Sequence, residues 1–237
     1  MQKAIVVGGS SGIGKALAIK LLENNYQVAI SGLERDDLSN LISKFSKNLT
    51  IQYIDCSREN CSYEVNALAE SLGGIDLLVY SAGVGHLNKD IGYTVENQAN
   101  KVNVIGFTEV LDWGYRYFVR QGHGHLVALS SFAGLFGYRT SPAYTAAKGY
   151  QINYLEALRQ KAYHLKKPVY VTDVRPGFVD TDISKELKRF WVATPEKAAA
   201  QIYWAIKNKR SMVYVTRRWR LIAFVISLLP DWVRGKL

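Results

Sequence analysis

The sequence predicts an α/β fold: a doubly wound parallel sheet of about seven strands flanked by helices, in one domain with a C-terminal extension. Three observations predict it. Short apolar runs rich in Val and Ile alternate with longer segments of helical periodicity, as expected for strands joined by crossover helices. A glycine-rich turn separates the first such run from the first helical segment. The length of 237 residues, 48% of them hydrophobic, suffices for one core without a second domain.

The expected strands and helices alternate through the whole domain. The strands are expected at Ala4–Val7, Gln27–Ile30, Thr50–Ile54, Ile75–Tyr80, His125–Leu129, Pro168–Val174 and Ser211–Val215. The helices are expected at Gly14–Asn24, Asp37–Phe45, Tyr63–Ser71, Tyr93–Arg120, Ala143–Lys166 and Pro195–Lys207. Neither a repeat nor a low-complexity linker interrupts this order, so residues 1–215 form the expected domain and residues 216–237 the extension. Ligands of such folds bind at the carboxyl ends of the strands.

The basic charge of the chain is concentrated near its C-terminal end. Thirty Lys and Arg against twenty Asp and Glu give +10, and the segment from Lys207 onward holds eight cations and one acid, or +7. The first 206 residues therefore carry only +3, which argues against a nucleic-acid-binding face. With two cysteines and no cleavable leader after Met1, a cytoplasmic protein is expected.

The first strand is followed by the turn Gly8-Gly9-Ser10-Ser11-Gly12-Ile13-Gly14, which suits a diphosphate. Gly8 allows the tight turn, Gly12 the close approach of a ligand, and Gly14 the close packing of helix on strand. The N–H groups and the dipole at the start of the helix attract phosphate. Glycines alone are weak evidence, but their place between the first strand and the first helix predicts nucleotide binding, with Ser10, Ser11 and Ile13 also in contact.

Three side chains farther along form the expected catalytic group. Ser131 follows a strand, and Tyr144 and Lys148, four residues apart, share one helix face. A free tyrosine has a pKa of about 10 and is a poor base at neutral pH. A cation about 4 Å away can lower that pKa by about three units, so Lys148 is expected to activate Tyr144. Alone, the pair would fit a solvated helix; together with Ser131 and the glycine turn it predicts catalysis.

These motifs resemble the short-chain dehydrogenase/reductase family in its compact form, over the chain to about Val215. The glycine turn matches the TGxxxGxG loop, and Tyr144 to Lys148 match the YxxxK motif. Ser131 and Asn103 complete the family's tetrad. The resemblance implies a Rossmann-type sheet and hydride transfer between nicotinamide and a carbonyl or alcohol. It makes Tyr144 the acid or base and Ser131 a ligand of the same oxygen. Lys148 would also bind the nicotinamide ribose, and Asn103 would support a water that links Lys148 to solvent. No metal is required.

The resemblance also implies further contacts with the cofactor. The PG motif is Pro176-Gly177, followed by Thr181 at the nicotinamide carboxamide, and Asp55-Cys56 matches the pair that holds the adenine. The NNAG motif keeps only Ala82-Gly83, after Tyr80-Ser81, and Val7 replaces the threonine of the glycine loop. Because those side chains chiefly brace the sheet, the two departures bear on local geometry more than on chemistry.

The residues after the second strand favour NADP over NAD as the cofactor. In this family, NAD users usually place an acid where Gly32 stands, and NADP users an arginine where Leu33 stands; neither is present. The missing acid leaves a 2′-phosphate unrepelled, and Arg35 and the two serines of the glycine turn can reach it. Glu34 argues mildly for NAD.

Apolar residues flank the expected substrate site. They are Phe132, Leu135, Phe136, Tyr138, Ile183, Leu187, Phe190 and Trp191. Ordinary loop packing explains most of them, yet Arg139 is the single charge between Leu129 and Thr140, which favours an apolar carbonyl or alcohol. His123 and His125 have no third ligand in view and are expected to be loop residues rather than metal ligands.

The C-terminal extension has the pattern of an amphipathic helix. Its apolar run Leu221–Leu229 is far shorter than the ~20 residues that span a bilayer. Its polar residues form a narrow stripe, and Pro230 is expected to kink the helix or start another turn. That stripe consists of Arg217, Arg220, Ser227, Asp231 and Arg234. Tryptophans at both ends and flanking arginines suit a peripheral membrane contact; the alternative is a helix that covers the substrate cleft or a neighbouring subunit.

We therefore expect an oxidoreductase acting on a small carbonyl or alcohol, with no nucleic acid as partner. The family resemblance implies a homodimer or homotetramer that associates through the helices containing Asn103 and Tyr144. The alternative is a non-catalytic scaffold or sensor that binds a nucleotide with the same fold. The intact set of Asn103, Ser131, Tyr144 and Lys148 argues against that alternative.

Overall fold

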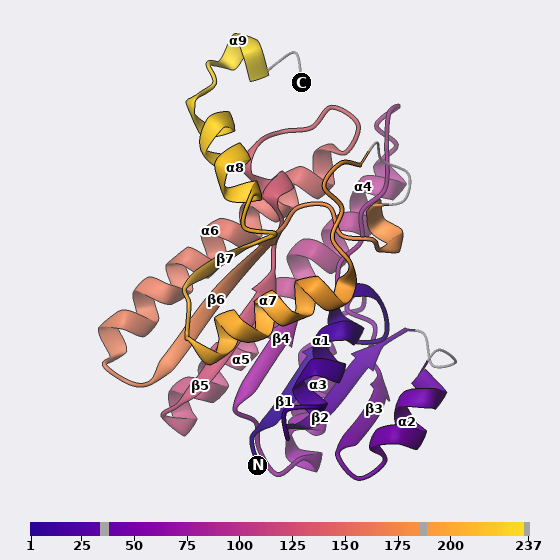
Figure 1. Ribbon diagram of the computed structural model, residues 1–237, viewed down its shortest axis with the longest axis vertical. Coiled ribbons are helices and arrows are strands. Elements are labelled where there is room, and N and C mark those ends of the chain that lie inside the picture. The colour runs from indigo at the N-terminus through magenta and orange to yellow at the C-terminus, as the bar shows by residue number, and fades with distance from the viewer. Residues whose placement is uncertain (34–37, 185–188, 235–237) are drawn as a thin grey trace.

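Seven parallel strands form one sheet through the centre of the molecule (Figure 1). The computed structural model describes residues 1–33, 38–184 and 189–234. The strands are β1 (Lys3–Val7), β2 (Gln27–Gly32), β3 (Leu49–Tyr53), β4 (Leu77–Tyr80), β5 (Gly124–Leu129), β6 (Val169–Pro176) and β7 (Met212–Val215). Their order is β3-β2-β1-β4-β5-β6-β7, and every neighbouring pair is parallel. The predicted doubly wound sheet is confirmed, with its switch point between β1 and β4, where such folds bind ligands.

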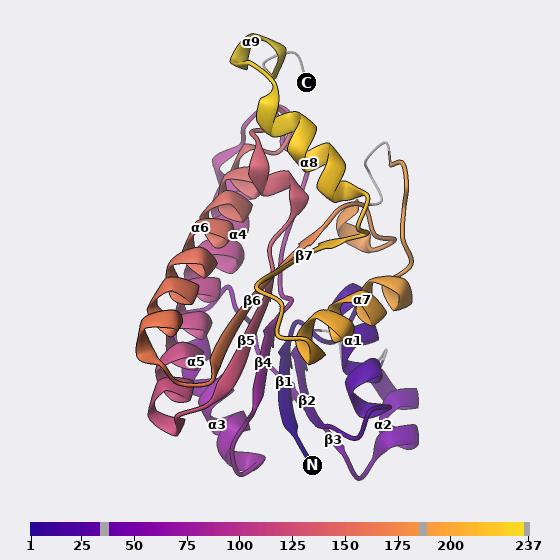
Figure 2. The same ribbon diagram turned by 60° about the vertical axis from the view of Figure 1, so that its left-hand side comes forward.

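Helices cover both faces of the sheet (Figure 2). One face carries α1 (Gly12–Leu22), α2 (Ser39–Phe45) and α7 (Pro195–Lys207), and the other carries α3 (Cys61–Ser71), α4 (Tyr93–Asn100), α5 (Phe107–Gln121) and α6 (Pro142–Leu165). Strand β1 shows why two cores result. Its successive side chains alternate in direction, so Ile5 packs in the core toward α5 and Val6 in the core toward α1.

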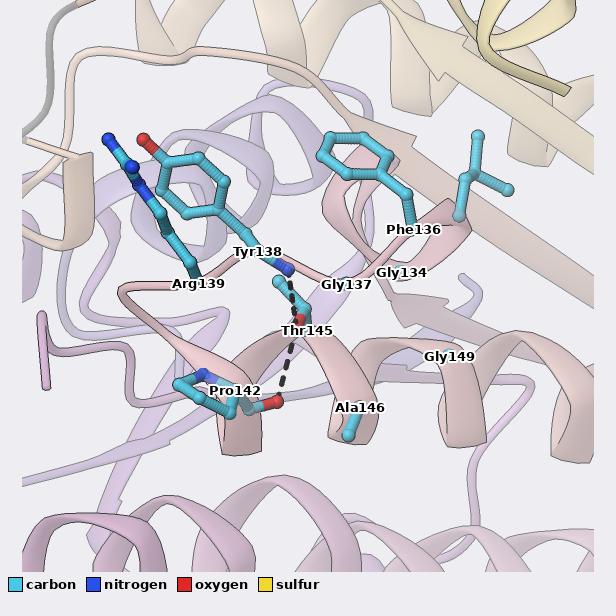
Figure 3. Close-up of a pocket in the computed structure, with 10 residues that line it drawn as sticks. Gly134, Phe136, Gly137, Tyr138, Arg139, Pro142, Thr145, Ala146 and Gly149 are labelled. Carbon is cyan, nitrogen blue, oxygen red and sulfur yellow. Dashed lines mark hydrogen bonds between the residues drawn. The ribbon is translucent and has the colours of Figure 1, made fainter. Parts of the chain in front are cut away.

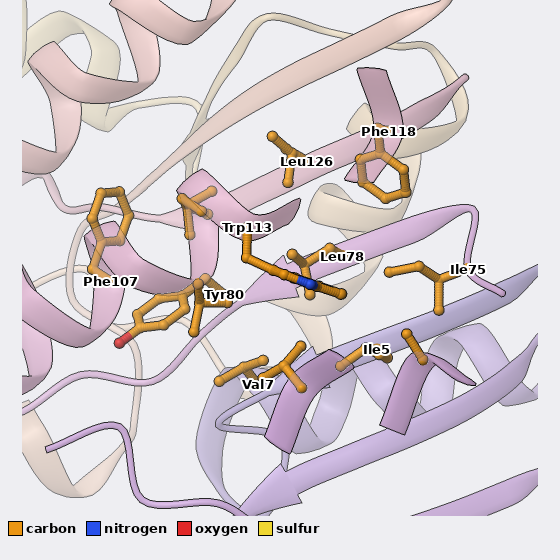
Figure 4. Packing of buried hydrophobic residues seen from close by; sticks show 14 of the residues in the cluster. Ile5, Val7, Ile75, Leu78, Tyr80, Phe107, Trp113, Phe118 and Leu126 are labelled. Atoms are coloured by element: carbon orange, nitrogen blue, oxygen red, sulfur yellow. The ribbon is translucent and has the colours of Figure 1, made fainter. Parts of the chain in front are cut away.

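The core between β4 and α5 holds α5 close to the sheet (Figure 4). Tyr80 meets Phe107 edge to face, with ring centres 5.4 Å apart. A Cβ at Gly114 would lie 2.4 Å from Leu78 Cδ2, so a side chain there would displace Leu78 between α5 and β4. This packing fixes the segment just before α5, which carries Asn103.

That segment is π-helical and differs from the prediction of one helix over Tyr93–Arg120. The chain instead runs through α4, the π-helical η2 (Lys101–Gly106) and then α5. A Cβ at Gly106 would lie 2.1 Å from the Cys56 carbonyl oxygen, so η2 touches the loop after β3. Helical periodicity alone does not distinguish a π-turn from α-helix, and such turns often occur at functional sites.

The other predicted boundaries lie within two residues of the observed ones where the structure describes them. The predicted start of the second helix, Asp37, lies outside the described residues. The extension forms α8 (Trp219–Leu228) and α9 (Asp231–Arg234), with the predicted break at Pro230. Both helices lie at the end of the molecule toward which the strands run (Figures 1 and 2). Within the described residues, no helix is both long and apolar enough to cross a bilayer.

Candidate active site

The glycine turn after β1 has the backbone that a phosphate-binding loop requires. Gly8 and Gly12 have φ angles of 77° and 51°, which favour glycine. A Cβ at Gly14 would lie 2.1 Å from the Gly8 carbonyl oxygen, so α1 approaches the turn only without a side chain there. In the described structure Ser11 precedes α1 without a side-chain cap, and the first turn contains no acid. The N–H groups of that turn therefore fit an anionic ligand such as a diphosphate.

Backbone hydrogen bonds brace this turn where two of the family's side chains are replaced. The Val7 carbonyl oxygen accepts hydrogen bonds from the N–H groups of Ser81 (2.7 Å) and Ala82 (3.0 Å). The Tyr80 hydroxyl donates to the Val102 carbonyl oxygen at 2.8 Å. The replacement by Val7 therefore leaves β1 joined to the end of β4, and Tyr80 itself joins β4 to η2.

Ser10 occupies the space in which an acid at the end of β2 would have to stand. A Cβ at Gly32 would lie 2.3 Å from the Ser10 Oγ and 2.7 Å from its Cβ. Ser10 is buried, so a carboxylate at position 32 would have to displace it. The neighbouring Leu33 is exposed. Glu34 and Arg35, which bear on the choice of cofactor, lie outside the described residues.

Ser131 and Tyr144 meet at the carboxyl end of β5. Ser131 precedes the short helix η3 (Phe132–Leu135), and its Oγ accepts a hydrogen bond from the Ala133 N–H at 3.0 Å. That bond uses a lone pair, so the hydroxyl hydrogen of Ser131 can still be donated. Tyr144, near the start of α6, lies close enough to the Ser131 hydroxyl for that group to oppose the rise in the Tyr144 pKa. The two groups therefore converge on one position.

Lys148 is buried beside Tyr144 and held by two hydrogen bonds. Its Nζ donates to the Leu129 carbonyl oxygen and to Gln151 Oε1, both at 2.9 Å, and lies 5.7 Å from the centre of the Tyr144 ring. Gln151 Nε2 in turn donates to the Asn103 carbonyl oxygen at 2.8 Å. The Gln151 side chain, which is fully buried, thus joins the lysine to the asparagine.

Asn103 is held in place by the loop after β4. Its Nδ2 donates to the Val84 carbonyl oxygen at 2.6 Å, and its Oδ1 accepts from the Val84 N–H at 3.1 Å. A Cβ at Gly83 would lie 3.3 Å from Asn103 Oδ1 and 3.6 Å from Lys148 Nζ. The four predicted catalytic residues are therefore brought together. Gln151 was missed, although its place seven residues after Tyr144 puts a polar side chain on the catalytic helix face.

Burial controls the pKa values of the catalytic pair. Burial raises the pKa of Tyr144 above its ordinary 10.0, and the hydrogen bond with Ser131 opposes the rise. Burial lowers the pKa of Lys148 to about 7, and the Asp173 carboxylate opposes that shift. The expectation that Lys148 depresses the pKa of Tyr144 is not met in this structure. An amine with a pKa of about 7 is only partly charged at neutral pH, so its field on the phenol is weak.

A buried ion pair underlies the ends of β5 and β6. Arg175 Nε donates to Asp173 Oδ2 at 2.6 Å, and the hydroxyl of Ser130 donates to Asp173 Oδ1 at 2.5 Å. Arg175 Nη1 also donates to the Tyr214 hydroxyl at 3.2 Å. Asp173 is thus a buried negative charge with partners on β5 and β6, and its field reaches Lys148.

The loop after β6 lies beside the glycine turn. A Cβ at Gly12 would lie 3.0 Å from Thr181 Cγ2, so the predicted nicotinamide and diphosphate contacts are neighbours. Pro176 ends β6, and the Gly177 N–H donates to the Val215 carbonyl oxygen at 2.6 Å. These predicted cofactor residues therefore share one edge of the sheet with the catalytic group.

Asp55 and Cys56, the predicted adenine contacts, have different surroundings. Asp55 Oδ1 accepts hydrogen bonds from the N–H (2.9 Å) and the hydroxyl (2.7 Å) of Ser57. Burial alone would raise the pKa of Asp55. The hydrogen bonds from Ser57 and the charge of Arg58 outweigh burial and lower the pKa below its ordinary value, so the carboxyl stays ionised. The Cys56 side chain is buried in the core that contains Tyr80. Only the backbone of Cys56 is therefore suited to a ligand.

Trp219 of α8 closes one side of the site. Its indole ring is 2% exposed and lies 4.7 Å from the ring centre of Phe132, 5.4 Å from that of Phe178 and 5.2 Å from that of Phe190. A Cβ at Gly177 would lie 2.1 Å from Trp219 Cε2. We call these four aromatic residues the aromatic wall. The sequence did not single out Trp219 as a site residue; its burial against Phe132 and Phe178 is consistent with the alternative in which the extension packs on the domain.

The remaining predicted substrate residues are divided between two places. A Cβ at Gly85 would lie 2.9 Å from Tyr144 Cδ2 and 3.1 Å from Ile183 Cγ2, so Ile183 lies near Tyr144. Leu135, Phe136 and Tyr138 instead line a cavity of about 510 Å³ between η3 and the first turns of α6 (Figure 3). Its lining does not include Tyr144, so this cavity lies beside the catalytic group. Leu187 lies outside the described residues, and Trp191 is half exposed.

The two histidines near β5 have structural partners. His125 lies in β5 rather than in a loop, and its Nε2 is 2.8 Å from Thr172 Oγ1. Burial lowers the pKa of His125 to about 4, so it is neutral at neutral pH. His123 Nε2 is 3.5 Å from a carboxylate oxygen of Asp76. In the described part of the chain, no group of three or more His, Cys, Asp or Glu is placed to hold a metal ion.

Comparison with known proteins places the chain among oxidoreductases. The family model described as short chain dehydrogenase matches residues 2–190. An uncharacterized oxidoreductase of Myxococcus xanthus is 30% identical over 189 residues, which cover 77% of this chain and 74% of that protein. An uncharacterized oxidoreductase of Staphylococcus epidermidis is 29% identical over 185 residues, covering 77% of this chain and 80% of that protein.

Solved structures share the fold at lower sequence identity. A short-chain dehydrogenase from Streptomyces avermitilis superposes with a TM-score of 0.83 at 19% identity, covering 100% of this chain and 95% of the other. An acetoin dehydrogenase from Salmonella typhimurium superposes with a TM-score of 0.77 at 21% identity, covering 90% and 94%. At these identities the likeness concerns the fold.

Proposed function

The chain belongs to the short-chain dehydrogenase family of NAD(P)-dependent oxidoreductases, and we propose that it interconverts a carbonyl and an alcohol group on an apolar small molecule. The observation that carries this proposal is the convergence of four polar side chains at the carboxyl ends of the strands, next to a turn suited to a diphosphate. These side chains are Asn103, Ser131, Tyr144 and Lys148.

Tyr144 is the proposed acid and base. Its raised pKa keeps the phenol protonated at neutral pH, so it can give its proton to a carbonyl oxygen. In the reverse direction, at higher pH, the phenolate takes the proton of the alcohol. The Ser131 hydroxyl donates a hydrogen bond to the same oxygen. A bound nicotinamide supplies or accepts the hydride.

The cofactor is proposed to lie along the carboxyl edge of the sheet. The first-turn N–H groups of α1 hold its diphosphate, Asp55 its adenine, and Lys148 its nicotinamide ribose. The full proposed set among the described residues is Gly8, Ser10, Ser11, Gly12, Ile13, Gly14, Asp55, Cys56, Ala82, Gly83, Tyr144, Lys148, Pro176, Gly177 and Thr181. Arg35 belongs to the same proposal but lies outside the described residues.

NADP is proposed in preference to NAD. Gly32 supports it, because no acid stands there to repel a 2′-phosphate or to bind a 2′-hydroxyl, and Ser10 fills the space beside it. Titration with NADPH and NADH, followed by energy transfer from tryptophan to nicotinamide, tests the choice. We expect NADPH to bind at least about tenfold more tightly. Tighter binding of NADH would reverse the choice of cofactor without affecting the proposed reaction.

An apolar substrate is supported by the aromatic wall and by Ile183, which border the site with carbon surfaces. Oxidation of NADPH in the presence of apolar ketones and aldehydes tests the reaction. The alternative is a scaffold or sensor that binds the nucleotide without turnover. Cofactor binding without turnover on any such compound would favour that alternative.

We also propose a homodimer or homotetramer and a peripheral membrane contact of residues 216–237. Ile105 in η2 and Tyr150 in α6, which are 58% and 37% exposed, support association through these helices. Size-exclusion chromatography with light scattering tests the assembly. A monomer at micromolar concentration would contradict it.

A further inference from the structure

Helix α8 has two apolar faces in different surroundings. Trp219 and Ala223 on one face are buried in a cluster with Phe132. Leu221, Val225 and Leu228 recur on the opposite face and are 71%, 55% and 67% exposed. Because the first face is packed, the second is held outward and cannot turn into the protein. An ordinary surface helix exposes polar residues there.

Neighbouring residues extend the exposed face. Phe190 and Trp191, half exposed, contact the Trp219 ring at 5.2 and 6.4 Å between ring centres. We call the combined set the outer apolar surface: Phe190, Trp191, Leu221, Phe224, Val225 and Leu228. Helix α8, which carries four of these residues, lies at the end of the molecule toward which the strands run (Figures 1 and 2). Ser131 and Tyr144 follow β5 at its carboxyl end. Exposed apolar side chains gathered on and beside one helix mark an interaction site.

The charge around this surface indicates which partner it suits. Arg218 donates to the Trp191 carbonyl oxygen at 2.8 Å and stacks over the Trp191 ring at 4.9 Å, beside exposed Arg217 and Arg220. Residues 216–237 contain five Lys or Arg and one acid. A second copy seated on the same surface would bring two such segments together, and like charges repel. Anionic phospholipid headgroups attract them.

We propose that the outer apolar surface docks on an anionic phospholipid bilayer, with α8 in the plane of the interface. The 10 residues of α8 extend about 15 Å, half the thickness of the hydrocarbon core, so the helix lies on the bilayer rather than across it. This docking rests on the peripheral membrane contact proposed above and gives it a surface and a lipid class, but it does not depend on the proposed reaction. If that reaction holds, docking brings the enzyme to a membrane in which apolar carbonyl compounds dissolve.

The test is co-sedimentation of the full chain with phosphatidylcholine vesicles, with and without phosphatidylglycerol. We expect binding to the anionic vesicles, weakened by high salt, and little binding to the neutral ones. The double variant Leu221→Glu/Leu228→Glu should bind at least about tenfold more weakly. The matched control Tyr63→Glu/Tyr163→Glu adds the same charges at exposed positions on α3 and α6 and should bind like the unchanged protein.

Several results would overturn the proposal. No sedimentation with anionic vesicles, or an unaltered Leu221→Glu/Leu228→Glu variant, would do so. Equal binding to neutral vesicles would exclude an anionic partner. A smaller oligomer of that variant in light scattering, without vesicle binding by the unchanged chain, would make the surface a contact between copies. Sedimentation needs no turnover, so it is independent of whether the enzyme is active.

A separate observation concerns Gln151. Both polar ends of its buried side chain are used, since the amide oxygen accepts from Lys148 and the amide nitrogen donates to Asn103. Because an ammonium only donates and a carbonyl only accepts, these contacts fix the orientation of the amide. We infer that Gln151 is a positioning residue that holds the Lys148 amine and links it to Asn103, an inference that rests on the proposed function.

The consequence is a pH effect with a definite sign. In the described structure, the titratable groups that face Lys148 are Tyr144 on α6 and Asp173, paired with Arg175, on β6. Gln151→Leu removes an acceptor that favours the charged amine, so the pKa of Lys148 should fall. Gln151→Glu adds a negative charge and should raise the pKa of Lys148.

One measurement tests this inference, with an expected shift of about one pKa unit of Lys148 in each variant. Competitive acetylation of lysines, read by peptide mass spectrometry, should show opposite shifts of the Lys148 pKa. Shifts in the same direction, or none, would overturn the role of Gln151. The acetylation remains informative if no substrate is turned over, so failure of the proposed function is seen separately.

Discussion

The two sides of Tyr144 are built on different principles. On one side, Lys148, Gln151 and Asn103 form a buried polar chain in which each side chain is hydrogen-bonded to the next or to backbone. On the other, the aromatic wall relies on ring contacts, and the buried Trp219 Nε1 has no hydrogen-bond partner within the described structure. Hydrogen bonds fix atoms to within a few tenths of an ångström, whereas aromatic packing tolerates changes of shape. The polar side is thus suited to chemistry and the aromatic side to substrate selection.

Tyr144→Phe should have the largest effect. Because the variant lacks the phenolic hydroxyl that gives or takes the proton, kcat should fall by about 10³-fold. The Kd for NADPH should change by less than about twofold. Steady-state kinetics and cofactor titration measure the two quantities. Tyr138→Phe, a change in the cavity beside the site, is the control and should retain turnover. Full activity of Tyr144→Phe would remove the proposed acid and base.

Asp173→Asn tests the buried ion pair between Asp173 and Arg175, which lies close to Lys148. It leaves Arg175 buried without its charge partner, so the free energy of unfolding should fall by about 3–5 kcal/mol in urea titrations. Asp173→Asn/Arg175→Met removes both charges and should recover most of the loss. A double variant no more stable than Asp173→Asn would mean that the pair is not the source of the effect.

Trp219→Ala tests the aromatic side. Loss of the indole ring from its contacts with Phe132 and Phe178 should lower the free energy of unfolding by about 3 kcal/mol. It should raise KM for an apolar carbonyl severalfold and change kcat little, since the ring touches no member of the polar chain. Trp219→Phe should restore most of the stability. A fall in kcat with unchanged KM would mean that Trp219 acts on the chemical step rather than on substrate binding.

The pH dependence of stability tests the free-energy cost of burying the charged amine of Lys148. Burial holds the pKa of Lys148 at about 7, below the 10.5 of the unfolded chain. The unfolded state therefore binds more protons between these values, and the penalty, complete below pH 7, is relieved as pH rises. From pH 7 to about 8.5, the unchanged protein should gain up to about 2 kcal/mol relative to Lys148→Met in urea titrations. Parallel pH profiles of the two proteins would contradict the lowered pKa.

Local signals accounted for the sheet, the glycine turn and the catalytic spacing. Alternation of apolar strands and helices depends on short-range periodicity, and Tyr144 and Lys148 share a face through helix geometry alone. Gln151 was missed although the same periodicity placed it on that face, because an inward-facing amide is recognised only when its partners are known. The π-helical turn around Asn103 was missed because η2 owes its position to the Cys56 carbonyl, far away in the sequence.

The sequence by itself determined the parallel sheet, the glycine turn after the first strand and the helical spacing of Tyr144 and Lys148, since each follows from residues close together in the chain. Only the tertiary structure decided which face of α8 is buried and which faces outward. It also decided that Ser10 occupies the space beside Gly32 and that burial dominates the pKa values of Tyr144 and Lys148. The physical reason is that desolvation and close packing depend on every element around a side chain, and those elements come from distant parts of the sequence.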